Sequence, residues 1–249
     1  MHRTVDTGEE IYWLRNFTGE DWQGRICFRE GGPCAALFNP ETGRMERLPR
    51  SGEGVALQLK AEDAVFVVLT SRPLDLPEAR QTGKASTLLT LDRWWDVAFD
   101  QQGGEKALET FSTLNDWTTN SDPVVRYFSG TARYTSTFAV PSGALAGLQE
   151  ARIDLGDVQV MAQLFVNGHD AGLLWRAPFL SPDLLPWLHE GKNTIEVRVT
   201  NLWPNRMIGD RQKGAAPVTR VRRFYNAGDP LLPSGLLGPV RLLGYRPAE

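Results

Sequence analysis

The sequence is short of the residues on which several kinds of protein chemistry depend. Its 249 residues include only three His and two Cys, so a zinc site, a His-based catalytic triad and a disulfide-stabilised scaffold all lack material. The chain has no Gly-x-Ser-x-Gly nucleophile elbow, and it has no glycine motif for a phosphate or a dinucleotide. These absences argue against nucleophilic, metal-dependent and nucleotide-dependent catalysis.

Excess charge and long apolar runs are also missing. The 27 basic and 30 acidic residues leave a net charge of −3, whereas a nucleic-acid-binding domain normally carries a basic face. No apolar run reaches the roughly 20 residues that span a bilayer, and polar residues rather than a signal-peptide core follow Met1. We therefore expect no nucleic-acid partner, no membrane partner and no signal peptide in this chain.

The residues that are present predict a chain built almost entirely of β-strands. Short apolar runs alternate with turn residues, and none has the length or period of a long helix. The first part predicts a small antiparallel β-sandwich over residues 1–72, with Pro40 and Gly43 in a hairpin turn. Its six strands are expected at 11–17, 25–29, 34–38, 44–48, 55–59 and 64–70. Residues 73–90 have no sustained period and are expected to form a linker.

Residues 91–249 predict a second, larger β-sandwich of the jelly-roll type. Asn167-Gly168 lies between two apolar runs and suits the positive φ angles of a type I′ hairpin turn. Asp183 is placed to cap a short helix over 184–188. The eight strands are expected at 94–100, 109–113, 132–140, 151–155, 161–166, 173–175, 193–201 and 240–245. Cys27 and Cys34 could pair, but free thiols are slightly favoured.

Several segments of this second part resemble the galactose-binding-like jelly roll and the carboxy-terminal region of α-L-rhamnosidase-type glycoside hydrolases. Ile11–Asn16 and Leu37–Gly43 are similar to the β-sandwich that follows the catalytic barrel in those enzymes. The segments that carry the resemblance in the second part are Tyr134–Pro141, Ile153–Gly156, Leu164–Gly168, Gly172–Trp175, Gly191–Val197 and Asn201–Asp210.

The resemblance implies a region without catalytic residues. The family's catalytic carboxylates and calcium ligands belong to a (β/α)-barrel, and no alternation of strands and helices of that length occurs in this sequence. We therefore expect a fragment, a split-gene product or one subunit of a larger assembly, with a catalytic barrel as its partner. The resemblance leaves room for a structural calcium ion in the jelly roll, and it suggests a periplasmic or extracellular parent enzyme.

Six residues near strand ends are candidates for carbohydrate binding. An indole ring can stack on the apolar face of a pyranose, while Asn, Asp and Arg side chains bind its hydroxyls. The alternative roles are core packing for the Trp residues and a turn or cap for the Asp. The candidates are Trp175, Arg176, Trp203, Asn205, Arg206 and Asp210. Apolar contexts predict burial instead for Trp13, Trp94, Trp95 and Trp187.

Three functions stay open at this level. The leading interpretation is a non-catalytic portion of an α-L-rhamnosidase-like enzyme that braces the catalytic barrel and binds carbohydrate weakly, with a rhamnose-containing glycan as the ligand that the resemblance suggests. The alternative is a separate carbohydrate-binding or protein-interaction module. A complete small glycosidase is the third interpretation, since that reaction needs two carboxyl groups and paired acidic residues are common here. These pairs lie in strands that point them to opposite faces or in turns that expose them to solvent, which argues against this interpretation.

Overall fold

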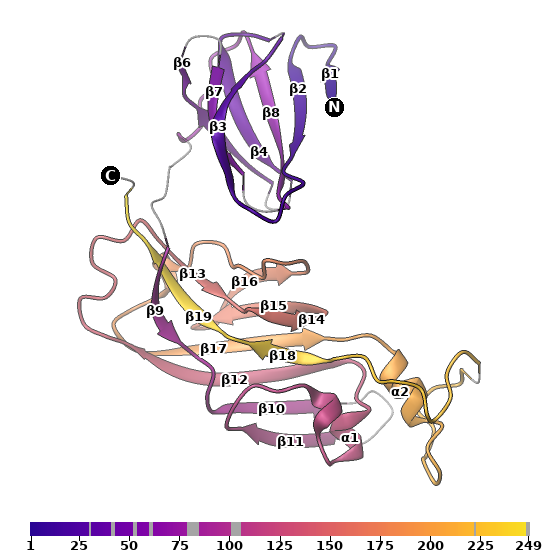
Figure 1. Ribbon diagram of the computed structural model, residues 1–249. Coiled ribbons are helices and arrows are strands. Elements are labelled where there is room, and N and C mark those ends of the chain that lie inside the picture. Colours follow the sequence, from indigo (N-terminus) through magenta and orange to yellow (C-terminus); the bar gives the residue numbers. More distant parts are fainter. Residues whose placement is uncertain are drawn as a thin grey trace. The chain divides into compact units, whose positions relative to one another are not determined.

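A computed structural model shows two compact units (Figure 1), Met1–Gln81 and Thr82–Glu249, and each has a hydrophobic core of its own. The structure describes residues 1–29, 31–40, 43–51, 54–59, 62–78, 85–100, 106–221 and 223–247. Within these residues the predicted fold class, an all-β chain with two sandwiches, is confirmed.

The first unit is a sandwich of two antiparallel sheets, one of five strands in the order β1-β2-β8-β4-β5 and one of three in the order β3-β7-β6. The strands are β1 His2–Thr4, β2 Glu10–Arg15, β3 Trp22–Cys27, β4 Cys34–Asn39, β5 Arg44–Leu48, β6 Arg50–Ser51, β7 Gly54–Leu59 and β8 Ala64–Thr70. Buried side chains from both sheets, including Val55, Leu57, Val67 and Leu69, form its core. Both Cys27 and Cys34 are free thiols.

Local sequence explains the hairpin between β4 and β5. Gly43 has a φ of +69°, which a glycine adopts without steric cost. Its N–H donates to the carbonyl of Asn39 over 2.9 Å, as the predicted turn requires. Glu41 and Thr42 lie outside the described residues. The turn sets the pairing of Asn39 with Arg44 and thereby the register of the two strands.

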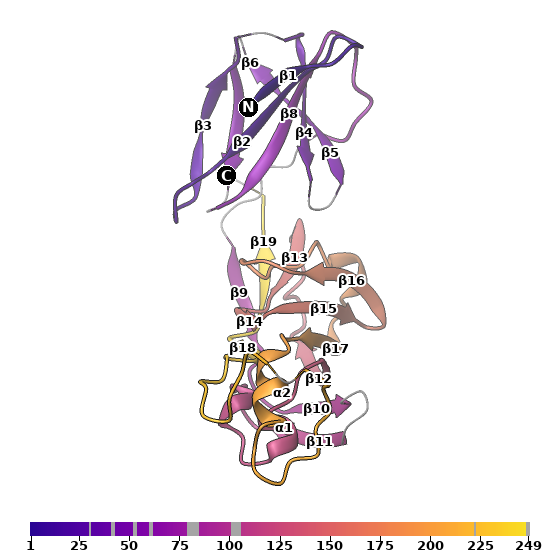
Figure 2. The ribbon, with the colours of Figure 1, turned by 90° about the vertical axis from the view of Figure 1, so that its right-hand side faces the viewer.

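The second unit has one six-stranded antiparallel sheet in the order β11-β10-β12-β17-β15-β16. A three-stranded sheet, β13-β19-β9, and a two-stranded sheet, β14-β18, supply the other strands (Figures 1 and 2). The strands are β9 Ser86–Thr90, β10 Trp95–Asp100, β11 Lys106–Phe111, β12 Thr131–Val140, β13 Glu150–Asp154, β14 Asp157–Gln159, β15 Met161–Val166, β16 His169–Leu174, β17 Gly191–Thr200, β18 Gly235–Gly238 and β19 Arg241–Tyr245. The helices are η1 Trp117–Thr119, α1 Pro123–Arg126, η2 Leu185–Trp187 and α2 Pro204–Gly209.

Alternation along the strands fills the core of this unit. Along β17 the odd-numbered residues Asn193, Ile195, Val197 and Val199 are buried while their neighbours are exposed or half-buried, because successive side chains of a strand point to opposite faces. The core joins these residues to buried side chains such as Ile153 from the facing layer. The even-numbered residues are left on the outer face of the six-stranded sheet.

Several local predictions can be compared with this unit. Asn167 and Gly168 have φ angles of +49° and +81°, so the type I′ turn between β15 and β16 is confirmed. The short helix after Asp183 is a 3₁₀ turn, and the Asp183 carboxylate accepts hydrogen bonds from the N–H groups of Leu185 and Ala151. It therefore ties the turn to the first residues of β13.

Two predicted irregular regions contain regular structure. Strand β9 lies inside the expected linker 73–90, yet it pairs with β19 and belongs to the second unit. Helices η1, α1 and α2 lie in stretches between the predicted strands, where the sequence predicted neither a strand nor a helix. Each is short, so the sequence offers no helical periodicity, and the local signals are limited to the start of each helix: Asp116 caps η1, Asp122 and Pro123 begin α1, and Pro204 begins α2.

Candidate functional site

Trp175 and Trp203, the two aromatic candidates, lie at the same end of the six-stranded sheet. Trp175 follows β16 and Trp203 follows β17, with β15 paired between these two strands. Their exposed fractions are 54% and 47%. Both side chains are therefore accessible, as their positions at strand ends predict. Arg176, next to Trp175, donates to the carbonyl of Ala177 over 3.3 Å.

Asn205 is not available to a ligand. It is 1% exposed, and both its amide nitrogen and its amide oxygen bond to other parts of the chain. The amide nitrogen donates to the Leu232 carbonyl over 2.7 Å and to Ser234 Oγ over 3.0 Å, and the amide oxygen accepts from the Leu232 N–H. The prediction that Asn205 contacts a sugar is therefore replaced by a structural role, which is to hold the segment before β18 against α2.

Arg206 and Asp210 pair with each other on the last turn of α2. Arg206 Nε lies 2.9 Å from Asp210 Oδ1, and the two side chains are 12% and 4% exposed. Asp210 Oδ1 also accepts from the Val218 N–H, and Oδ2 accepts from the N–H and the hydroxyl of Thr219. Asp210 thus fixes the loop that follows α2, and the turn interpretation of this residue describes it better than ligand binding.

The charge of Asp210 is held by these contacts. Burial raises the pKa of the Asp210 carboxyl, but the hydrogen bonds from Thr219 and Val218 and the Arg206 guanidinium together outweigh it, so the pKa is lowered. A carboxylate with four donors directed at it is a buried structural anion. Among the six candidates, the structure leaves Trp175, Trp203 and Arg176 at the surface and commits Asn205, Arg206 and Asp210 to internal contacts.

A wide recess lies on the outer face of the six-stranded sheet. It is an open groove of about 810 Å³ that crosses strands β10, β12, β17 and β15, which run side by side in Figure 1. We call it the sheet-face groove. Its lining residues are Arg93, Trp94, Asp96, Thr135, Ser136, Thr137, Phe165, Gly168, Thr194, Ile195, Glu196 and Arg198.

Side-chain size explains why the outer face is hollow there. Small hydroxyl side chains lie at one end of the groove on the two central strands, where Thr137 pairs with Thr194 across the sheet, while Glu196 and Arg198 stand farther along β17. Larger side chains stand on the flanking strands: Trp94 precedes β10, and Phe165 belongs to β15. The short Thr137 and Thr194 side chains between Trp94 and Phe165 leave room above the sheet at this end of the groove.

Trp94 forms one wall of the sheet-face groove and is 68% exposed, so the prediction that it is buried is wrong. Its φ of +60° is uncommon for a bulky residue. The Ser136 hydroxyl donates to the Trp94 carbonyl over 2.9 Å, and the next residue, Trp95, is fully buried with its indole N–H on the Leu91 carbonyl. Trp95 anchors the chain in the core while Trp94 is left outside.

The opposite wall is a stacked pair. The Arg198 guanidinium lies 4.4 Å from the centroid of the Phe165 ring, and Arg198 Nε donates to Glu196 Oε1 over 2.7 Å. The other acidic residue of the groove, Asp96, accepts from the Thr110 hydroxyl over 2.8 Å. The groove thus presents hydrogen-bond donors and acceptors together.

Sequence reasoning missed this groove although one signal was available. In Trp94-Trp95 two large aromatic residues are adjacent at the start of a strand, and neighbours in a strand point to opposite faces. Only one of the two could have been buried in the core. Most of the other groove residues come from four strands, so their proximity depends on the order of strands in the sheet.

Four carboxyl groups among the described residues have a shifted pKa. All four shifts, those of Glu9, Glu10, Glu190 and Asp210, are downward. Within the same residues no cluster of three or more His, Cys, Asp or Glu side chains could hold a metal ion. No helix in the described part of the chain is long and apolar enough to cross a membrane.

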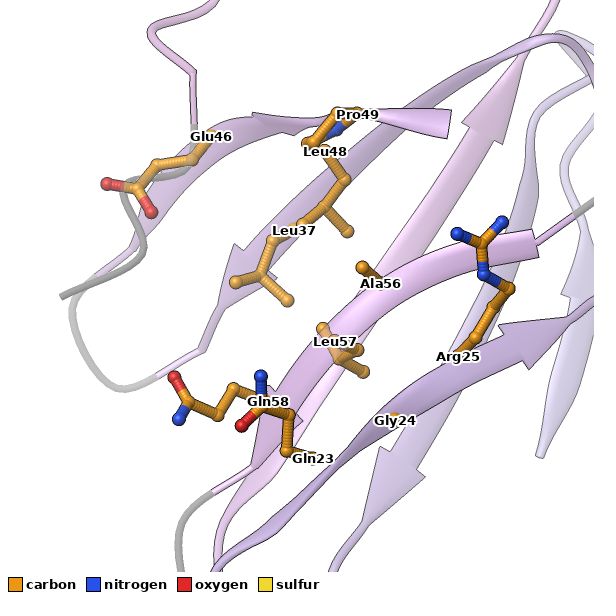
Figure 3. A pocket seen from close by; sticks show the side chains of 10 residues that line it. All are labelled: Gln23, Gly24, Arg25, Leu37, Glu46, Leu48, Pro49, Ala56, Leu57 and Gln58. Atoms are coloured by element: carbon orange, nitrogen blue, oxygen red, sulfur yellow. The ribbon is translucent and has the colours of Figure 1, made fainter. Parts of the chain in front are cut away.

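The first unit has a smaller recess of about 310 Å³ between β3, β7, β4 and β5 (Figure 3). Leu37, Leu48 and Leu57 form its apolar side, and Gln23, Arg25 and Gln58 stand around its rim. It opens where the two sheets of the small sandwich diverge. No exposed aromatic side chain lines it, so it lacks the platform that the sheet-face groove has.

Comparison with known proteins relates nearly all of this chain to glycoside hydrolases. No protein-family model matches the sequence. A rhamnosidase from Novosphingobium sp. PP1Y has a region that matches 98% of this chain with a TM-score of 0.82 and 38% identity, and this region is 23% of that enzyme. A protein of Formosa agariphila named as a candidate β-glucuronidase is 32% identical over 90% of this chain.

This chain spans less than a quarter of the length of both relatives, because the match covers 22% of the Formosa protein and 23% of the rhamnosidase. The Novosphingobium match covers 98% of this chain and therefore includes residues of both units. The resemblance read from the sequence is thereby confirmed: over almost its whole length, this chain is similar to a rhamnosidase-type region of a larger glycoside hydrolase.

Proposed function

We propose that this chain serves as a non-catalytic accessory region of an α-L-rhamnosidase-like glycoside hydrolase and braces the part of the enzyme that carries the active site. The observation that supports this most is the match of 98% of the chain to only 23% of a rhamnosidase.

The segment 202–232 is the surface that we propose for bracing. Among the described residues it carries five exposed large apolar side chains: Leu202, Trp203, Val221, Phe224 and Leu232. Such side chains gathered on one segment are typical of a surface that another protein part covers. The loops of this segment surround α2 in Figure 2, and the Asn205 and Asp210 contacts fix their course.

A turnover assay tests the non-catalytic part of the proposal. The purified chain is incubated with p-nitrophenyl α-L-rhamnopyranoside and with p-nitrophenyl β-D-glucuronide, and the Novosphingobium rhamnosidase serves as a positive control. We expect no release of nitrophenol above that in buffer. Turnover by the purified chain that scales with its concentration would overturn the proposal and favour a complete small glycosidase.

A chimera tests the bracing part. The matching 23% of the Novosphingobium rhamnosidase is either deleted or exchanged for this chain. We expect the deletion to abolish soluble, active enzyme and the exchange to restore a measurable fraction of both. An exchange that performs no better than the deletion would contradict the bracing role. Phe224→Ser in the exchanged chain should lower recovery, while Phe17→Ser, at a similarly exposed position in the first unit, should not.

A further inference from the structure

We infer that the sheet-face groove of the second unit binds a short stretch of a neutral oligosaccharide, with Trp94 as the stacking platform. This inference goes beyond the proposed bracing function and does not depend on it. It also differs from the loop candidates at Trp175 and Trp203, because the groove lies on the face of the sheet and contains neither residue.

The first step is the platform. A Trp that is 68% exposed leaves much of its ring in water, which is unfavourable unless another surface covers it at times. The backbone of Trp94 has a φ of +60°, and its carbonyl is held by Ser136, so the residue is fixed at the edge of the groove. The indole ring turns about only two side-chain torsions, so it offers a flat apolar face at low cost in conformational entropy.

The second step is the row of polar groups beside the platform. Asp96, Thr135 and Glu196 are direct cross-strand partners on the outer face, and Glu196 is followed by Phe165 on β15. Carboxylate and hydroxyl oxygens therefore alternate across the floor toward Arg198, which is paired with Glu196. Sugar hydroxyls both donate and accept, and a row that contains carboxylates, hydroxyls and a guanidinium can satisfy them.

The third step is size. From β10 to β15 the groove crosses three strand spacings of about 4.8 Å each, roughly 14 Å in all. This length and a volume of about 810 Å³ exceed what a single monosaccharide needs, and they fall within the range of small-ligand sites. The ligand that fits is a segment of two or three pyranose units. One unit stacks on Trp94 and the others lie across the Thr residues of the floor.

The fourth step is charge. The groove contains two acidic residues, Asp96 and Glu196, and two basic residues, Arg93 and Arg198. Arg198 is already paired with Glu196, so no excess of positive charge is directed at a ligand. A uronic acid would meet the carboxylates of the floor, and like charges at short range repel. The balance therefore favours an uncharged sugar.

The test uses the indole N–H resonances of the eight Trp residues in the full chain as reporters. Maltotriose, cellotriose, mannotriose and a rhamnose-containing trisaccharide are titrated as neutral probes, and trigalacturonate is the charged probe. We expect at least one neutral probe to shift the Trp94 resonance, while those of Trp13 and Trp22 in the first unit stay in place. Assignment of the Trp94 resonance comes from its loss in Trp94→Phe.

Two variants and two matched controls locate the site. Trp94→Ala should weaken binding about tenfold or more through the lost stacking, and Thr135→Phe should do the same by filling the floor while the Trp94 ring is retained. Trp175→Ala and Trp203→Ala remove comparably exposed indoles outside the groove, and they should leave the affinity within about twofold. In each variant, the indole resonances of the other Trp residues should stay unchanged, which shows that the fold is intact.

Three results would overturn the inference. The first is that no neutral probe shifts the Trp94 resonance at about 20 mM, a concentration that saturates a millimolar site. The second is binding that is lost in Trp175→Ala or Trp203→Ala and kept in Trp94→Ala, which would place the site on the loops. The third is binding of trigalacturonate alone. The turnover assay and the chimera are unaffected by any of these results, so failure of the groove to bind sugar is separate from failure of the proposed function.

Discussion

Asp210 provides the most direct test of a side chain that could bind a ligand or support the fold. In Asp210→Asn one carboxylate oxygen becomes an amide nitrogen, which cannot accept a hydrogen bond. If that atom faces Thr219, the N–H and hydroxyl of Thr219 lose their acceptor. If it faces the other way, the Val218 N–H and the Arg206 guanidinium lose their acceptor. The Arg206 side chain, 12% exposed, loses its counter-charge in both cases.

Two lost hydrogen bonds, at least one of them to a charged group, correspond to a decrease of about 2–4 kcal/mol in the free energy of unfolding. For a unit of this size that is a decrease in Tm of roughly 5–10 °C. Urea denaturation with hydrogen exchange at the Val218 and Thr219 amides measures both the global and the local effect. We expect faster exchange at these two amides even under conditions where the chain stays folded.

The matched control is Asp229→Asn, because Asp229 accepts one backbone hydrogen bond, from Asn226, at an exposed position of the same long segment. This change should alter stability by less than about 0.5 kcal/mol. The structural role of Asp210 is refuted if Asp210→Asn is as stable as the control and its Val218 and Thr219 amides remain protected. A loss of trisaccharide affinity without a loss of stability would make Asp210 a ligand contact again.

Two further predictions concern buried and titratable groups of the second unit. Tyr134 is fully buried, and its hydroxyl accepts from the Trp117 indole N–H over 2.5 Å and from a backbone N–H of β18. Tyr134→Phe should therefore cost about 2–4 kcal/mol in urea denaturation by leaving two donors unpaired, and a change below about 0.5 kcal/mol would contradict this account. Hydrogen bonds from the Gly143 N–H, and to a smaller extent from the Ser142 hydroxyl, lower the pKa of Glu190 in the folded chain. The ionised Glu190 therefore stabilises the fold fully above the ordinary carboxyl pKa of about 4.3, and this stabilisation is lost as the pH falls through the lowered pKa of the folded chain. Glu190→Gln should flatten the loss of stability on the acid side in thermal melts between neutral and acidic pH, and an unchanged pH profile would exclude this contribution.

Short-range patterns predict much of this fold. Alternation fixes most strands because burial of one face requires period two, as β17 shows at Ile195, Val197 and Val199. The turn at Asn167-Gly168 is predicted because few residue pairs adopt two positive φ angles. Strand β9 is missed because its residues alternate weakly and its pairing partner, β19, lies about 150 residues away in the chain.

The candidate site was predicted less well, for a physical reason that Asn205 and Trp94 illustrate. Asn205 lies in a segment rich in residues that bind sugars, but a distant carbonyl and hydroxyl, from Leu232 and Ser234, occupy its amide. Trp94 lies in an apolar context that favours burial, but its neighbour Trp95 takes the core position. Composition alone cannot say which partner a polar group finds or which of two adjacent rings is buried.

The sequence by itself determined that this chain is all-β and that it is poor in the residues of nucleophilic and metal catalysis, because strand periodicity, turn chemistry and composition are local properties. Short segments of the sequence also carried the resemblance to a rhamnosidase-type region. Only the tertiary structure decided that Asp210 is a buried anchor, that Trp94 is exposed, and that Asp96, Thr135, Glu196 and Phe165 form one row. These properties depend on which strands lie side by side, and strand order is set by packing between residues that are far apart in the chain.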